Sequence, residues 1–119
     1  MLSIKEKGVI YCIIDHCKRV EETINGKTKL DFDNSQDIRD IVCFNILQIG
    51  ELAKNLSPLF VANHGNVPWK NIKGMKDWVA HSYGTIDFEI IWKTASEDIK
   101  PLKDYCEEIL QENWGTLFK

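Results

Sequence analysis

Residues 35–56 read SQDIRDIVCFNILQIGELAKNL, a stretch whose apolar positions recur at steps of three and four. This spacing places side chains on one face of an α-helix. Ser35 can cap the start of that helix, with Asp37 in its first turn. The main seam contains Ile38, Val42, Asn45, Ile49, Leu52 and Leu56. Further apolar residues lie off that seam, namely Cys43, Phe44, Ile46, Leu47 and Ala53. A helix that is apolar around most of its circumference needs cover on two sides, so we expect a homodimer built partly on this helix.

The flanking segments have the same helical spacing. Apolar residues predict a first helix over residues 10–24, and Asn25-Gly26 then favours a left-handed stop. Residues 27–34 are mostly polar and predict a connector. Ser57-Pro58 predicts a short capped helix.

The second half of the chain predicts two further long helices. One runs from near Pro68 to about His81, and Asp87 can cap the next. Pro101 interrupts the hydrogen-bond ladder of that last helix, so the pattern either kinks or restarts there. The sequence therefore predicts an all-α, antiparallel bundle of four to five helices.

Composition narrows the class of protein further. The chain has 119 residues, the size of one ordinary domain, so we expect a single domain with residues 113–119 as a less ordered tail. A net charge of −3 argues against coating nucleic acid through bulk electrostatics. No run approaches the ~20 apolar residues of a membrane span. The first residues lack the order of a signal peptide, so we expect a cytoplasmic protein without membrane association.

The four cysteines are scattered along apolar helical faces, and we interpret Cys12, Cys17, Cys43 and Cys106 as reduced core residues. Cys12 and His16 lie one helical turn apart and could share a metal ion. Because no second ligand pair has a recognisable spacing, we expect neither a metal site nor a cofactor.

The segment from Lys76 to Tyr83 is the most chemically suggestive part of the sequence. If the helix reaches His81, Asp77 and His81 lie one turn apart, on the side away from the helix's own apolar face. The Asp77 carboxylate can accept a hydrogen bond from one imidazole nitrogen and fix the tautomer. The other nitrogen is then available for general acid–base chemistry.

Lys70, Lys73 and Lys76 follow one another at three-residue intervals on the same helix and could hold phosphate near His81. A histidine beside a cation suits attack by a ribose 2′-hydroxyl on its own phosphodiester, with the cation stabilising the charge that develops on the phosphoryl oxygens. The alternative interpretation is a solvated lysine face and a weak surface pair between Asp77 and His81.

Three segments of the sequence together resemble the HepT-like HEPN family. Residues 69–83, WKNIKGMKDWVAHSY, resemble its signature R-x-x-x-x-H-x-Y preceded by W-x-x-I-x-G-M. Residues 49–54, IGELAK, resemble its I-G-E-A element, and residues 87–102 fit its closing segment. The resemblance extends over about residues 6–110.

This resemblance implies a helical bundle that dimerises, with two copies of the motif facing one cleft. It also implies a metal-independent ribonuclease toxin that acts on RNA and is paired with a minimal nucleotidyltransferase antitoxin. His81 would take the role of the catalytic histidine, Lys76 that of the phosphate-binding cation, and Asp77 would orient His81. Tyr83 would match the tyrosine that the antitoxin modifies with AMP.

One position departs from the family pattern, because Lys76 stands where the motif has arginine. The charge is kept, but the planar fork that grips two phosphate oxygens is lost. The alternative function is therefore a catalytically weak or inactive HEPN subunit that binds a minimal nucleotidyltransferase. A third possibility, a purely structural helical dimer, leaves the motif unexplained.

Two polar residues of the helix over residues 35–56 are further candidates for the cleft. Asn45 either contributes to the cleft or is a buried hydrogen-bonding residue that fixes the packing register. Glu51 either approaches the cleft or pairs with a lysine at the surface.

Overall fold

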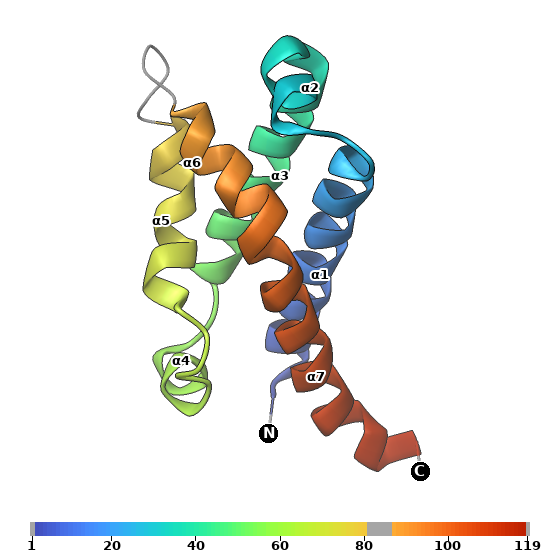
Figure 1. Ribbon diagram of the computed structural model, residues 1–119. Helices are drawn as coiled ribbons and strands as arrows, with labels where there is room; N and C mark the ends of the chain where they lie inside the picture. The colour runs from blue at the N-terminus through green and yellow to red at the C-terminus, as the bar shows by residue number, and fades with distance from the viewer. Residues whose placement is uncertain (1, 81–86, 119) are drawn as a thin grey trace.

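The computed structural model describes residues 2–80 and 87–118, with side chains for residues 2–74 and 87–112. All regular structure in those residues is helical (Figure 1). The long helices are α1 (Ile4–Ile24), α3 (Gln36–Ala53), α5 (Trp69–Ala80) and α7 (Ile99–Phe118). The shorter elements are α2 (Lys29–Asn34), α4 (Pro58–Asn63), α6 (Phe88–Lys93) and a π-helix, η1 (Thr94–Asp98). The predicted all-α class is confirmed.

The long helices form one bundle in which α3 packs against both α1 and α5, and α1 also packs against α7 (Figure 1). Aliphatic side chains from all four contribute to a continuous core, including Ile13, Ile46, Ile72 and Ile109. Along the described residues, no helix has the length and apolar composition needed to cross a membrane.

The predicted caps form at the start of three helices. Ser35 Oγ accepts a hydrogen bond from the Ile38 amide at 3.2 Å. Ser57 Oγ accepts from the Phe60 amide at 3.1 Å, and Asp87 from the Glu89 amide at 3.0 Å. Each cap pairs an amide that the helix itself leaves without a partner. The stop after α1 is also confirmed, since Gly26 has a φ of 73°.

The connector predicted over residues 27–34 contains a short helix, α2. Thr28 and Asp31 form a reciprocal capping box that starts α2, and its hydrogen bonds lower the pKa of the Asp31 carboxyl. Phe32 is fully buried, with its ring 6.1 Å from that of Phe88 and 5.3 Å from that of Trp92. The short helix therefore holds one core side chain within a polar segment, which periodicity over so few residues cannot reveal.

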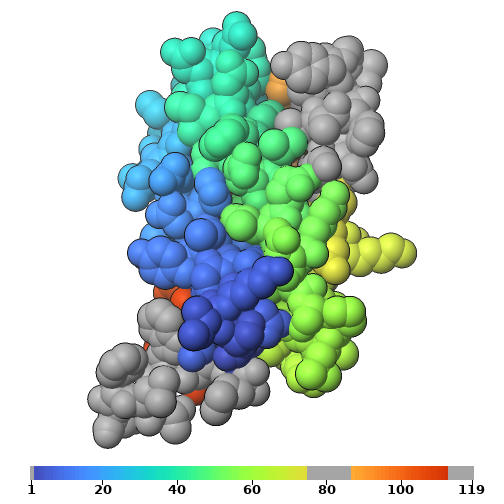
Figure 2. All heavy atoms as spheres, turned by 180° about the vertical axis from the view of Figure 1, so that it is seen from behind, coloured from blue at the N-terminus to red at the C-terminus, as the bar shows by residue number. Residues whose placement is uncertain are grey.

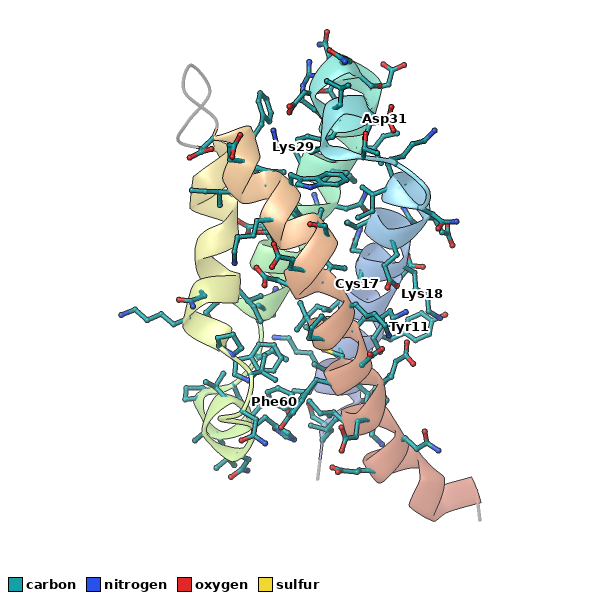
Figure 3. The ribbon with its side chains drawn as sticks, in the orientation of Figure 1. Tyr11, Cys17, Lys18, Lys29, Asp31 and Phe60 are labelled. Carbon is teal, nitrogen blue, oxygen red and sulfur yellow. The ribbon has the colours of Figure 1, made fainter. Side chains whose placement is uncertain are left out.

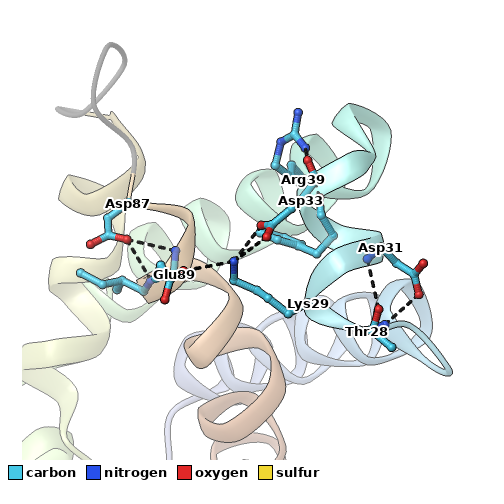
Figure 4. Close-up of polar contacts among 9 residues, drawn as sticks. Thr28, Lys29, Asp31, Asp33, Arg39, Asp87 and Glu89 are labelled. Atoms are coloured by element: carbon cyan, nitrogen blue, oxygen red, sulfur yellow. Dashed lines mark hydrogen bonds and ion pairs between the residues drawn. The ribbon is translucent and has the colours of Figure 1, made fainter.

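Polar contacts on the outside of α2 join it to α6 and α3 (Figure 4). Lys29 Nζ lies 2.7 Å from Asp33 Oδ2 and 3.3 Å from Glu89 Oε1, and these carboxylates raise the pKa of Lys29. Arg39 donates a hydrogen bond to the Phe32 carbonyl at 3.1 Å. The segment after α1 is thus tied to two elements that follow it in the chain.

Helix α3 is covered on two sides by helices of its own chain, α1 and α5. Among the apolar residues off its seam, Cys43, Ile46 and Ala53 are buried within the bundle, where α1 and α5 both pack on α3. Phe44 remains 52% exposed, and Ile41 remains 46% exposed. The apolar surface left for another chain is therefore smaller than the sequence pattern indicates.

The interruption expected at Pro101 appears as a π turn just before it. The Ile99 amide donates to the Thr94 carbonyl, five residues earlier. Pro101 then falls in the first turn of α7, where its missing N–H is tolerated. The carbonyl of Glu97, with which the proline ring would clash in an unbroken α-helix, lies in the widened turn.

Candidate functional site

Helix α5 carries the motif, and its observed bounds, Trp69–Ala80, match the predicted helix closely. Lys76 and Asp77 lie on this helix, but their side chains are outside the described residues, as are His81 and Tyr83 altogether. The predicted pairing of Asp77 with His81 and the predicted modification of Tyr83 therefore stay predictions. What the structure shows is how the helix bearing the motif is held.

The start of α5 is fixed by an aromatic cluster. Trp69 is buried and its Nε1 donates a hydrogen bond to the His64 carbonyl at 3.0 Å. The Trp69 ring also lies edge-on to Phe60, whose ring stacks on His64 with centroids 4.3 Å apart. Phe60 projects from α4 into this cluster (Figure 3). Because a buried aromatic side chain with a paired polar atom has few alternative positions, this cluster fixes the orientation of α5 at its first residue.

Two of the predicted phosphate-binding lysines lie on the first half of α5. Lys70 is exposed and Lys73 is half-buried. Among the described residues, no acidic side chain forms an ion pair with either of them. Three-residue spacing places the two side chains on neighbouring parts of the helix surface, so both are available to an anionic ligand.

Asn45 is a packing residue between α3 and α1. It is buried, and its Nδ2 donates to the Ile41 carbonyl at 2.8 Å. Its Oδ1 lies 2.7 Å from His16 Nδ1. A carbonyl oxygen can only accept, so the amide orientation is fixed and Oδ1 accepts the Nδ1–H of His16. The proposed alternative of a register-fixing hydrogen bond describes what Asn45 does in the bundle.

His16 takes part in this packing contact, whereas the sequence offered it only as a possible metal ligand beside Cys12. Its Nδ1 lies against Asn45 Oδ1, and this side-chain hydrogen bond joins α1 to α3. The Phe44 ring lies edge-on to it at 6.4 Å. The two polar partners are 29 positions apart in sequence, and no local pattern indicates that they meet.

Glu51 does not share a face with Asn45. Six residues of α-helix separate their directions by about 120°. Glu51 is half-buried, its Oε1 is buried and lies 3.8 Å from Lys54 Nζ, and its approach to the cleft stays a prediction. The two candidates on α3 therefore do not form one cluster.

The four thiols are free, and three of them are buried as predicted: Cys17, Cys43 and Cys106. Cys17 lies where α1 packs against α7 (Figure 3). The prediction that Cys12 is a core residue is wrong, because its side chain is exposed. It lies on the surface of α1, on the side turned away from the core. In the described part of the chain, no three histidine, cysteine or acidic side chains come together as a metal site would require.

Comparison with known proteins yields consistent matches. A family model described as "Ribonuclease HepT-like" matches residues 13–109. A protein of Caldanaerobacter subterraneus subsp. tengcongensis named "Putative RNase TTE0752" is 34% identical over 100 residues, covering 84% of this chain and 89% of that protein. "Putative RNase MJ0127" of Methanocaldococcus jannaschii is 28% identical over 115 residues, covering 93% of this chain and 95% of that protein. "Probable ribonuclease HepT" of Thermococcus cleftensis is 38% identical over 61 residues, covering 51% of this chain and 56% of that protein. No solved structure matches the chain.

Proposed function

The chain belongs to the ribonuclease HepT-like family, and from that membership we propose that it is a HEPN-type ribonuclease that cleaves RNA without a metal ion. The observation that carries this proposal is the family match over residues 13–109, which includes the whole of α5 and the motif that follows. The structure supports it by holding α5 firmly at its start and leaving Lys70 and Lys73 without described acidic partners.

The proposed reaction is transfer of a phosphodiester to the neighbouring ribose 2′-hydroxyl. The 2′-oxygen attacks phosphorus as the bond to the 5′-oxygen breaks, giving a 2′,3′-cyclic phosphate and a free 5′-hydroxyl. His81 accepts the proton from the 2′-hydroxyl or donates one to the leaving 5′-oxygen, and Asp77 orients its ring. Lys76, supported by Lys73 and Lys70, stabilises the charge on the phosphoryl oxygens.

We propose that the active form is a homodimer in which two motifs share one cleft. The apolar surface that supports this is the outer side of α3, where Ile41 and Phe44 remain partly exposed. Figure 2 shows α3 beside α1 on this face of the molecule, and Ile41 and Phe44 share a shallow hollow there with Arg19, Glu22 and Thr23 of α1. Exposed aromatic and aliphatic side chains grouped in this way mark contact surfaces more often than isolated ones do.

We further propose a partner for this dimer, a minimal nucleotidyltransferase acting as antitoxin. It would transfer AMP to the Tyr83 hydroxyl, releasing pyrophosphate from ATP, and the added phosphate would block the cleft by charge repulsion with RNA. This pairing follows from the family resemblance of the motif around Tyr83.

A second candidate function is favoured by one specific residue. Lys76 occupies the motif's arginine position and offers a point charge where the family has a bidentate fork. A subunit that has lost most of its activity, and acts mainly by binding the nucleotidyltransferase, would show such a change.

One experiment separates these functions: RNA cleavage in the presence of EDTA by the wild type, His81→Ala and Lys76→Arg, each expressed alone. We expect cleavage by the wild type, a loss of about 10²-fold or more in His81→Ala, and a gain of up to about 10²-fold in Lys76→Arg. Lys18→Arg is the matched control, because Lys18 is an exposed lysine on α1. It should leave the rate unchanged. No cleavage by either the wild type or Lys76→Arg would reject the nuclease and favour the binding subunit.

A further inference from the structure

A cleft of about 500 Å³ opens between the start of α5, the π turn η1 and the first half of α7. Figure 1 shows α7 diverging from α5 along this side of the bundle. The floor is apolar and includes Val67, Ile72 and Leu102. Its polar lining comes from Asn66, Asn71, Lys93, Asp98 and Tyr105. A cavity of this size with an apolar floor and a few polar groups suits a small planar ligand.

The π turn decides which charges face this cleft. In a regular α-helix, Lys93 and Asp98 would point about 140° apart, because five residues at 100° each exceed a full turn. A π turn closes its hydrogen bond over five residues, here from the Ile99 amide to the Thr94 carbonyl. Residues five apart then lie little more than one turn apart and point in similar directions. As a result both Lys93 and Asp98 line the cleft.

The polar side chains that line the cleft are available to a ligand. None of the five polar side chains forms a hydrogen bond or ion pair with another described residue. Together they offer an ammonium donor, a carboxylate acceptor, two amides that both donate and accept, and a phenol. A ligand that satisfies them must present both donors and acceptors along one edge.

We propose that this cleft binds a guanine base of single-stranded RNA. Guanine is the base with two adjacent N–H donors, N1–H and N2–H, which match the two oxygens of the Asp98 carboxylate. Its O6 and N7 acceptors match a lysine ammonium, here Lys93. The Tyr105 ring and the aliphatic floor cover the faces of the base, as in other single-strand sites.

The position of the cleft relates it to the proposed nuclease, on which this inference rests. Asn71 and Ile72 line the cleft, and the motif begins at Lys76 on the same helix. Five residues of α-helix span about 7.5 Å. His81 is expected on the opposite side of α5 from Ile72, so a strand cleaved at the motif would pass around α5 to place a nearby base in the cleft, where it would set a preference for the sequence cleaved.

Binding can be tested without cleavage, by NMR titration of the full-length protein with GMP, AMP, CMP and UMP. We expect GMP to bind at least about tenfold more tightly than the others and to shift the Asn71 and Tyr105 signals. Asp98→Asn should weaken GMP binding by about tenfold or more, because a charged hydrogen-bond acceptor is removed. Glu97→Gln is the matched control, since Glu97 lies in the same π turn, is exposed and does not line the cleft. It should bind GMP like the wild type.

The outcomes separate this inference from the proposed function. Equal binding of all four nucleotides, or GMP binding unaffected by Asp98→Asn, overturns the guanine site even if the wild type cleaves RNA. Selective GMP binding that depends on Asp98 and persists in His81→Ala supports the site, even if no RNA is cleaved and the nuclease is rejected. If Asp98→Asn unfolds the protein, Lys93→Met tests the site instead. Removing this ammonium donor should also weaken GMP binding.

Discussion

At the scale of single residues, burial divides the four thiols. Cys17, Cys43 and Cys106 are buried, and desolvation raises the pKa of Cys43 to about 11 and of Cys106 to about 12. Burial likewise raises the pKa of Cys17. Since the thiolate is the reactive form, these three side chains are both inaccessible and protonated at neutral pH. Cys12 differs because it is exposed on α1.

This difference predicts one fast-reacting thiol per chain. In the native protein at about pH 8, a disulfide reagent such as DTNB should modify one equivalent quickly, and Cys12→Ser should abolish that phase. Cys43→Ser should keep it. Denatured protein should show all four thiols. A second fast equivalent in the native wild type would contradict the observed burial.

At the scale of elements, α2 shows how one core side chain organises a short segment. A six-residue helix has little stability of its own. The capping box of Thr28 and Asp31 starts it, and the ring of Phe32 packs against those of Phe88 and Trp92. Phe32 thereby joins the segment between α1 and α3 to α6.

Replacing this ring should cost much of the protein's stability. Phe32→Ala should lower the free energy of unfolding by about 3–5 kcal/mol, through lost burial and the cavity left behind. Leu30→Ala is the control on the same helix, because Leu30 is 68% exposed, and it should change stability by less than about 0.5 kcal/mol. Urea unfolding at one fixed protein concentration measures both. Equal effects of the two substitutions would show that α2 does not contribute to the core.

At the scale of the whole molecule, the bundle covers α3 on two sides and leaves a third side open. That side carries Ile41 and Phe44 and adjoins α1. A second copy packed there would bury both side chains, so that α3 would be buried around most of its circumference, as its apolar sequence predicts. The proposed shared cleft depends on this contact.

Sedimentation at micromolar concentration tests the contact directly. The wild type should sediment as a dimer, and Phe44→Glu should shift it to monomer, because a charge would be buried without a partner. Leu59→Glu is the control, since Leu59 is an exposed apolar residue on another helix, α4, and the dimer should persist. A monomeric wild type would remove the composite cleft.

The sequence by itself determined the helical class, most element boundaries and the family. Caps at Ser35, Ser57 and Asp87 and the turn at Gly26 act within four residues, so local chemistry is sufficient to predict them. The bounds of α5, and hence the helix that carries the proposed site, followed from the same local rules.

Tertiary structure decided which side chains meet. The burial of Phe32, the hydrogen bond between His16 and Asn45, and the exposure of Cys12 each depend on helices distant in the chain. The π turn that brings Lys93 and Asp98 to one cleft likewise accommodates the packing around Pro101. Helical periodicity specifies the direction in which a side chain points, but only the arrangement of the neighbouring helices specifies what it contacts there.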